Sequence, residues 1–358
     1  MPSLFAPIRL GAVTAPSRIL MAPLTRARAT MDHVPTPIMV DYYRQRAGAG
    51  LIISEATGIS PQGLGWPYAP GIWNADQVEA WRSITTAVHE AGGLIFSQLW
   101  HMGRVVHPSL PGRSRPVSSS ATTMPGLART YDGKQPYVQA RAMTHEDIRS
   151  VIADYRAAAA NALAAGFDGV EVHAANGYLI DQFLRDNANF RTDEYGGSIE
   201  NRTRFLFEVT RAVVEVVGAD RTAVRLSPNE ERQGVNDSHP EPLFALASSG
   251  LSDLGIAFLE VREPGFEGTN GRAERTPVAP LMRAVFKGAF VLNSDYDDKK
   301  GQEALDHGRA DAISYGRPFI SNPDLPRRFI QGLALALDDM NTWYSQGPAG
   351  YVDYSAAE

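Results

Sequence analysis

The sequence predicts an α/β fold, a (β/α)8 TIM barrel in which eight short strands alternate with helices along the chain. Short apolar runs rich in β-branched residues recur, as expected for parallel strands that are buried on both faces. Segments with helical periodicity separate these runs. A doubly wound sheet is the alternative, but no Gly-x-Gly-x-x-Gly motif follows the first run. Because neither a repeat nor a linker interrupts this order, we predict a single domain over residues 1–358.

The predicted strands follow one another at the spacing that a barrel requires. They cover residues 19–24, 51–56, 94–99, 169–173, 222–226, 258–261, 290–292 and 312–315. The predicted helices cover residues 76–91, 144–165, 199–217, 242–254, 299–307 and 325–337. Two helix ends carry independent signals, because Thr144 and Asp147 form a capping box and Gly166 stops the helix before the fourth strand.

One connection is unusually long, from residue 102 to residue 142, and it is rich in proline, serine and glycine. Its prolines are Pro108, Pro111, Pro116, Pro125 and Pro136. A connection of this length in a compact domain is usually functional or mobile. Since it follows the third strand, we expect it to lie over the catalytic face of the barrel as a lid.

The composition excludes several classes of function. The chain has no cysteine, which rules out disulfides, thiolate zinc sites, Cys-ligated iron–sulfur clusters and a cysteine nucleophile. A net charge of -6 gives no general attraction to nucleic acid or to an anionic membrane. With no basic segment before an apolar core and no apolar run of about 18 residues, we expect a cytoplasmic protein without a membrane partner.

Polar residues fall at the ends of the predicted strands, where barrel enzymes assemble their active sites. The fourth strand is followed by the most informative group, His173, Asn176 and Tyr178. His and Asn can donate two hydrogen bonds to one substrate oxygen, and a nearby Tyr can supply a proton. A buried structural histidine is the ordinary alternative for His173. The presence of Asn176 and Tyr178 beside it at a strand end favours a site for electrophilic activation instead.

Three motifs in this chain resemble those of the Old Yellow Enzyme family of FMN-dependent ene-reductases. They are Gln98-Leu-Trp-His-x-Gly-Arg104, His173-Ala-Ala-Asn-Gly-Tyr-Leu179 and Phe190-Arg-Thr-Asp-Glu-Tyr-Gly-Gly-Ser-Ile-Glu-Asn-Arg202. The resemblance runs nearly from end to end and is closest to the bacterial N-ethylmaleimide and xenobiotic reductase group. The family's fold is the barrel that the strand pattern predicts.

The resemblance implies an FMN cofactor whose ring meets amide and hydroxyl partners along its polar edge. Thr25 and Gln98 fit that edge, and Arg225 fits the negative charge that reduction places near N1 and O2. Arg317 and the backbone after the last two strands would hold the phosphate. The implied cofactor residues are Ala22, Pro23, Leu24, Thr25, Ala56, Gln98, His173, Arg225, Asn293, Ser294, Asp295, Gly316 and Arg317.

Each of these assignments has an ordinary alternative. Gln98 could be a satisfied buried amide, Thr25 a helix cap and Arg225 the partner of a carboxylate. The chain also departs from its relatives at Asn293-Ser294-Asp295, where they commonly carry Gly or Ala. Because a carboxylate close to a phosphate is unfavourable, we expect Asp295 to turn its side chain away and contribute only its backbone.

The resemblance also implies a reaction. His173 and Asn176 would hold the oxygen of an α,β-unsaturated carbonyl, maleimide or nitroalkene, hydride would pass from flavin N5, and Tyr178 would protonate the product. NADPH or NADH would reduce the flavin in the same pocket. The expected walls of the substrate pocket are Trp66, Tyr68, Trp100 and Tyr344.

Two other barrel classes are poorer matches. A metal-dependent hydrolase would need a His-x-His pattern near the first strand, which this chain lacks, and we expect no metal. A 2,4-dienoyl-CoA reductase would need cysteines for its iron–sulfur cluster. A non-enzymatic binding barrel remains an alternative, and both a monomer and a homodimer are open.

Overall fold

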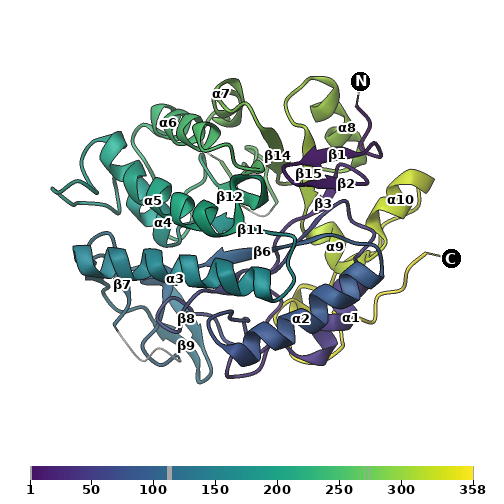
Figure 1. Cartoon of the computed structure of the whole chain (residues 1–358), viewed down its shortest axis with the longest axis horizontal. Coiled ribbons are helices and arrows are strands. Elements are labelled where there is room, and N and C mark those ends of the chain that lie inside the picture. The colour runs from purple at the N-terminus through teal and green to yellow at the C-terminus, as the bar shows by residue number, and fades with distance from the viewer. Residues whose placement is uncertain (1, 111–114, 270, 274, 358) are drawn as a thin grey trace.

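The computed structural model describes residues 2–110, 115–269, 271–273 and 275–357. Its centre is a barrel of parallel strands surrounded by helices (Figure 1). In the described part of the chain, all eight predicted strands are present. They are β3 (Ile19–Met21), β4 (Ile52–Ile53), β6 (Ile95–Trp100), β11 (Gly169–His173), β12 (Thr222–Leu226), β13 (Phe258–Arg262), β14 (Ala289–Asn293) and β15 (Ala312–Tyr315).

The barrel closes between its last strand and its first. Ile313 of β15 lies opposite Ile19 of β3, and β6 pairs with β11, so the parallel pairing runs around the whole circle. The predicted (β/α)8 barrel is therefore confirmed. A further short strand, β5 (Thr57–Gly58), pairs in parallel with the end of β6.

Two strands are shorter than predicted, and both end where the chain turns toward the barrel mouth. β3 ends at Met21, shortly before Pro23, which has no N–H to continue a strand. β4 ends at Ile53, because the backbone N–H of Glu55 donates to the Tyr43 hydroxyl at 2.8 Å. Apolar character alone does not mark these boundaries.

The predicted helices also form. They are α2 (Ala75–Glu90), α3 (His145–Ala164), α5 (Ile199–Val217), α6 (Pro240–Asp253), α8 (Asp298–Asp306) and α10 (Leu325–Gln331). The capping box is confirmed, since the Thr144 side chain accepts from Asp147 N. The predicted extent 325–337 is wrong, because Gly332 adopts a left-handed φ of 63° and ends α10.

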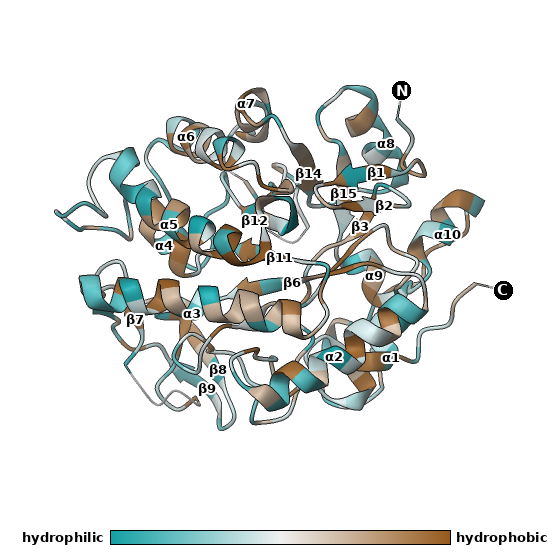
Figure 2. Cartoon of the chain, viewed as in Figure 1, coloured by the Kyte–Doolittle hydropathy of each residue, from teal (hydrophilic) through white to brown (hydrophobic). Residues whose placement is uncertain are grey.

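Further elements lie outside the predicted segments. The additional helices are α1 (Pro37–Gln45), α4 (Leu179–Leu184), α7 (Ala279–Val285) and α9 (Arg317–Ser321). Short 3-10 turns are η1 (Gly103–Val105), η2 (Ala219–Arg221) and η3 (Met340–Thr342). Figure 2 shows hydrophobic and hydrophilic residues alternating along α2, α3 and α5, as helices with one buried face require.

An antiparallel hairpin lies across one end of the barrel. Its strands are β1 (Ile8–Leu10) and β2 (Val13–Ala15). Leu10 belongs to the same buried cluster as Phe96 and Phe258, which point into the barrel from β6 and β13. The hairpin therefore fills the end at which the strands begin and leaves the other end open to build a site.

The long connection after β6 is more ordered than a plain loop. It contains a parallel pair, β7 (Val117–Ser118) with β10 (Arg141–Ala142), and a hairpin of β8 (Leu127–Thr130) and β9 (Gly133–Pro136). Pro111 lies outside the described residues. The connection packs apolar residues such as Met102 and Tyr137 beside Tyr178, and its function as a lid stays a prediction.

Buried arginines fasten the C-terminal segment, residues 319–351, to the barrel. Arg46 is fully buried and donates to the carbonyls of Phe319 and Ile320 at 2.9 and 2.8 Å, and it lies 3.7 Å from the centre of the Tyr42 ring. The ring of Tyr42 stacks on Tyr351 at 4.1 Å.

Arg26 and Arg28 contribute to the same attachment. Arg26 donates to Gly350 O at 2.7 Å, and Arg28 donates to Thr342 O and Ala349 O at 3.0 and 3.1 Å. Each guanidinium satisfies several carbonyls at once because its five N–H donors are arranged in a rigid fork.

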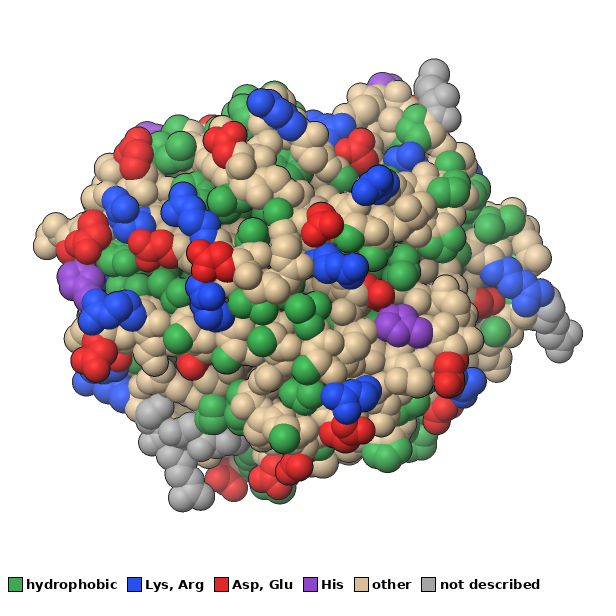
Figure 3. Space-filling model, in the orientation of Figure 1, with side chains coloured by type: hydrophobic (Ala, Val, Ile, Leu, Met, Phe, Trp, Pro, Cys, Tyr) green, Lys and Arg blue, Asp and Glu red, His purple; other side chains and the backbone are tan. Residues whose placement is uncertain are grey.

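The surface carries charges of both signs. Figure 3 shows acidic and basic side chains next to one another on the face in view. Among the described residues, no helix is both long and apolar enough to cross a membrane.

Arg46→Met is expected to lower the free energy of unfolding by about 3 kcal/mol or more, because it leaves buried carbonyls without donors. Urea denaturation would measure this. Arg44→Met is the matched control, since Arg44 is half exposed and forms a surface ion pair with Asp41, and its effect should stay below about 1 kcal/mol. Equal effects of the two substitutions would contradict the anchoring role.

Candidate active site

A cavity of about 490 Å³ opens at the end of the barrel where the strands terminate. Its volume falls in the usual range for small-molecule sites. Most of the predicted site residues line it. They are Ala22, Pro23, Leu24, Thr25, Ala56, Gln98, Trp100, His173, Asn176, Tyr178, Arg225, Asn293, Ser294, Asp295, Gly316, Arg317 and Tyr344.

The three predicted catalytic residues meet on one wall of the cavity. His173 is the last residue of β11, and its ring lies edge to face with Tyr178 at 5.0 Å. Trp100 packs against Tyr178 at 4.9 Å. Asn176 has a left-handed φ of 59° and is held by its N–H, which donates to the Ser227 hydroxyl at 2.8 Å. A tight turn therefore presents all three side chains to one space.

The protonation states suit hydrogen-bond donation. Burial lowers the pKa of His173 well below its ordinary value, and the positive charges of Arg225, Arg232 and Arg262 lower it further. The backbone N–H of Ala175 points at His173 Nδ1 at 3.3 Å, so the neutral ring carries its proton on Nε2.

Tyr178 also stays protonated at neutral pH. Burial raises the pKa of Tyr178 to about 12, although the nearby Arg232 opposes this rise. The phenol therefore keeps a proton that it can give to a developing carbanion.

Polar side chains form the floor of the cavity. Gln98 donates to Glu171 at 2.7 Å, and Arg225 donates to Asn293 at 2.8 Å and lies 3.6 Å from Glu260. The Nε atom of Arg225 is buried and has no hydrogen-bond partner within the described ranges. Gln98 is thus a hydrogen-bonded buried amide, and Arg225 has a carboxylate neighbour, as their ordinary alternatives state. Arg225 nevertheless keeps a donor for a ligand.

The other end of the cavity is built from the residues after β14 and β15. Ser294 and Asp295 have positive φ angles of 128° and 46°, so the backbone turns sharply there. The Asp295 carboxylate lies 2.7 Å from Arg317 and accepts from Thr269 N at 3.0 Å. The Asp295 side chain thus pairs with Arg317, and its expected orientation away from a bound phosphate stays a prediction.

Two predicted wall residues, Trp66 and Tyr68, are not among the described residues that line the cavity. Trp66 packs on Tyr344 at 5.1 Å, and Tyr68 lies edge to face with Tyr131 at 5.0 Å. Contact of Trp66 or Tyr68 with substrate stays a prediction.

Sequence reasoning missed several lining residues, above all Arg232 and Arg262. Arg262 ends β13 one residue beyond the predicted strand, so a correct strand end would have revealed it. Arg232 lies in a loop without a recognisable motif. The C-terminal segment adds further wall residues. They are Leu335, Ala336, Leu337, Asp338 and Trp343.

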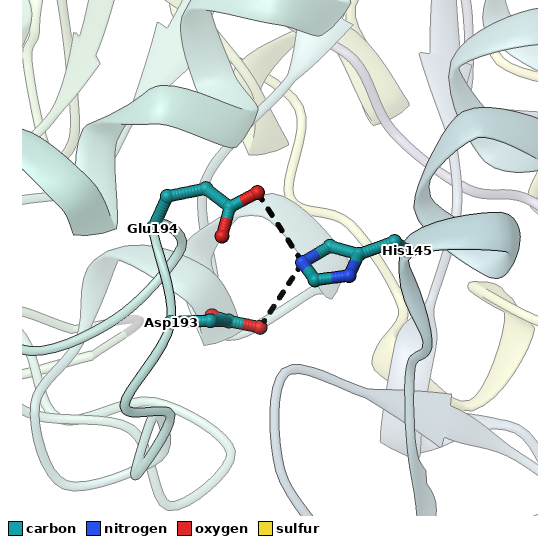
Figure 4. A group of neighbouring side chains, drawn as sticks. All are labelled: His145, Asp193 and Glu194. Carbon is teal, nitrogen blue, oxygen red and sulfur yellow. Dashed lines mark ion pairs between the residues drawn. The ribbon is translucent and has the colours of Figure 1, made fainter.

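A group of possible metal ligands lies apart from the cavity (Figure 4). His145 Nε2 lies 3.3 Å from both Asp193 and Glu194. Arg191 already forms a two-pronged ion pair with Asp193, and this pair lowers the pKa of Asp193. Because the Arg191 guanidinium already pairs with the Asp193 carboxylate, this group of residues does not support a metal site.

The fold and the cavity together define the class of protein. An eight-stranded barrel holds a cavity lined by guanidinium groups, with a neutral His, an Asn and a Tyr on one wall. This is the arrangement of a barrel oxidoreductase that binds a phosphorylated planar cofactor.

The chain belongs to the NADH:flavin oxidoreductase / NADH oxidase family, whose model matches residues 3–336. A solved Old Yellow Enzyme homologue from Zymomonas mobilis is 61% identical, covers 99% of both chains and has a TM-score of 0.98. Morphinone reductase in complex with tetrahydroNAD is 44% identical, over 100% of this chain and 98% of its own, with a TM-score of 0.94.

A curated relative, 12-oxophytodienoate reductase 2 of Arabidopsis thaliana, is 40% identical over 359 residues, which is 99% of this chain and 96% of the relative. The resemblance to the Old Yellow Enzyme family is confirmed. The family's cofactor is FMN.

The residues present fit FMN. Thr25 and Gln98 offer polar groups for the ring edge, Arg225 keeps a buried unpaired donor, and Arg317 offers a guanidinium at the opposite end for a phosphate. This separation of a polar floor from a cationic end is what a flavin with a ribityl phosphate requires.

The lowered pKa of His173 predicts that its ring stays neutral through the pH range in which an ordinary histidine, with a pKa of about 6.5, gains its proton. In ¹⁵N NMR spectra of histidine-labelled protein, its signals should show the Nε2–H tautomer and should not shift across this range. The variant His173→Asn assigns the signals by their loss. A titration midpoint near the ordinary histidine value of about 6.5 would contradict the electrostatic account.

Proposed function

We propose that this protein is an ene-reductase that uses FMN and NADPH, with NADH as the alternative donor, to reduce alkenes conjugated to a carbonyl or nitro group. The observation that carries this proposal is the meeting of His173, Asn176 and Tyr178 on one wall of a cavity that fits FMN. Bound FMN supplies the hydride. The side chains of the cavity supply orientation, polarisation and the proton.

His173 and Asn176 activate the substrate in this proposal. The Nε2–H of His173 and the amide of Asn176 donate to the carbonyl or nitro oxygen, which draws charge onto that oxygen and makes the β-carbon electrophilic. A neutral imidazole suits this role because it donates a hydrogen bond without transferring its proton. The turn that sets the φ of Asn176 fixes the direction of its amide.

Tyr178 is the proposed proton donor. Its hydroxyl lies on the wall beside His173, and Trp100 packs against the ring and fixes its position. The raised pKa keeps the phenol protonated, and the positive charge of Arg232 favours the phenolate left after proton transfer.

We assign the cofactor contacts as the sequence predicts them. Thr25 and Gln98 would meet the ring edge, Arg225 the N1 and O2 side, and Arg317 with the backbone of residues 293–295 the phosphate. The chain is proposed to form one domain, with the connection at residues 102–142 as a lid beside Tyr178.

Anaerobic stopped-flow spectroscopy tests the function. NADPH should bleach the flavin band, and 2-cyclohexenone should restore it. Tyr178→Phe should leave bleaching intact but slow reoxidation by the enone about a hundredfold, because the proton donor is lost. His173→Ala should slow reoxidation and weaken binding of phenols. Unchanged reoxidation in Tyr178→Phe would remove Tyr178 from this role, and absence of bleaching would exclude the function.

Asp295→Asn is expected to tighten FMN binding to the apoprotein about tenfold, because it removes a negative charge that competes with the phosphate for Arg317. Quenching of flavin fluorescence measures the affinity. Riboflavin, which lacks the phosphate, is the matched control ligand, and its affinity for the apoprotein should not change on the substitution. Weaker FMN binding by Asp295→Asn would mean that Asp295 serves to orient Arg317 instead.

A further inference from the structure

Arg232 occupies a fixed place beside the catalytic wall. It lies in the loop between β12 and α6, where Val235 N donates to Arg232 O at 3.1 Å and closes a tight turn. The Arg232 carbonyl lies directly against Gly177, since a Cβ added to Gly177 would come within 2.6 Å of that oxygen. Gly177 separates Asn176 from Tyr178, so the loop rests on the catalytic turn.

The turn that carries Arg232 is also held from its other side. Arg104 donates to Gln233 O at 3.0 Å and to the Thr122 hydroxyl at 3.0 Å. Arg104 itself is almost fully buried. The backbone that presents Arg232 is therefore positioned by packing and hydrogen bonds on two sides.

The side chain of Arg232 keeps most of its donors for a ligand. It lines the cavity together with His173, Asn176 and Tyr178, and 34% of its surface is exposed. In the described ranges, its one hydrogen-bond partner is Glu230, at 3.1 Å. A guanidinium has five N–H donors, so a second planar acceptor can bind beside Glu230.

Glu230 contacts a second guanidinium besides that of Arg232. Its second oxygen forms an ion pair with Arg262, which also lines the cavity and points toward Asn176 Oδ1 at 3.5 Å. One buried carboxylate thus serves two guanidinium groups. The charge of Arg232 also reaches the reacting groups: it adds to burial in lowering the pKa of His173, and it opposes the burial that raises the pKa of Tyr178.

The acidic residues that line the cavity within the described ranges are engaged elsewhere. Asp295 pairs with Arg317, Asp297 caps α8 through Lys300 N, and Asp338 accepts from Trp343 Nε1 at 2.6 Å. These three carboxylates come from the β14 side and the C-terminal segment. Arg232 therefore lines the cavity with His173, Asn176 and Tyr178, while these carboxylates belong to other elements.

We propose that Arg232 is a specificity-determining residue that selects activated alkenes carrying a carboxylate in addition to the carbonyl or nitro group. The carbonyl oxygen binds His173 and Asn176, and the carboxylate accepts paired hydrogen bonds from Arg232. This inference rests on the proposed function and names its substrate class. The reaction itself is unchanged: the alkene gains a hydride from the reduced cofactor and a proton from Tyr178.

Binding without turnover gives the first test. Isothermal titration calorimetry of the FMN-loaded protein compares levulinate with methyl levulinate, which are saturated and differ in one negative charge. Arg232→Gln should weaken levulinate binding about thirtyfold relative to the ester, the range expected for a charge-assisted pair. Arg232→Lys should retain part of the preference. Arg156→Gln is the matched control, because Arg156 pairs with Glu215 on the outer helices and should change nothing.

Turnover gives the second test. The ratio of kcat/KM for 4-oxopent-2-enoate and its methyl ester should fall about thirtyfold in Arg232→Gln and stay constant in Arg156→Gln. In the unaltered protein, added salt should weaken the binding of levulinate but not of its ester, which tests the charge even if a variant fails to fold.

Two outcomes separate this inference from the proposed function. Identical carboxylate-to-ester ratios in the unaltered protein and Arg232→Gln would overturn the role of Arg232, even with full activity on 2-cyclohexenone. If neither the oxopentenoates nor 2-cyclohexenone is reduced, the proposed function fails, and the calorimetric comparison still decides whether Arg232 binds a carboxylate.

Discussion

The pairing of β15 with β3 is the constraint on which the site depends. It closes the parallel sheet, and Ala22 N then donates to Tyr315 O at 3.0 Å across the junction. Because every strand of a closed parallel barrel ends at the same rim, residues from positions 22 to 344 are forced to share one cavity. The hairpin of β1 and β2 fills the opposite end, so the rim is the place left for a ligand.

The barrel and its catalytic wall could be predicted because their signals are local. The apolar run at residues 169–173 is a strand with those bounds, and His173, Asn176 and Tyr178 follow it within one turn. Arg232 could not be found this way, since its place depends on the packing of its carbonyl against Gly177, 55 positions away in the chain. The ion pair of Asp295 could not be found this way either, because the sequence does not show that Arg317 and Thr269 attract its carboxylate.

The distribution of guanidinium groups separates structural from functional roles. Arg26, Arg28 and Arg46 are buried and spend their donors on backbone carbonyls. Arg225 and Arg232 line the cavity and have N–H donors that can bind a ligand. The same side chain serves both purposes because a rigid fork of donors either completes a backbone network or recognises a planar acceptor.

The attachment of the C-terminal segment has a consequence for biosynthesis. Residues 335–344 form part of the cavity wall, and the buried arginines that hold them bind carbonyls as late as Tyr351. During translation the strands of the barrel emerge before this wall does. Until residues 335–344 have emerged, the pocket of a nascent chain therefore lacks one of its walls.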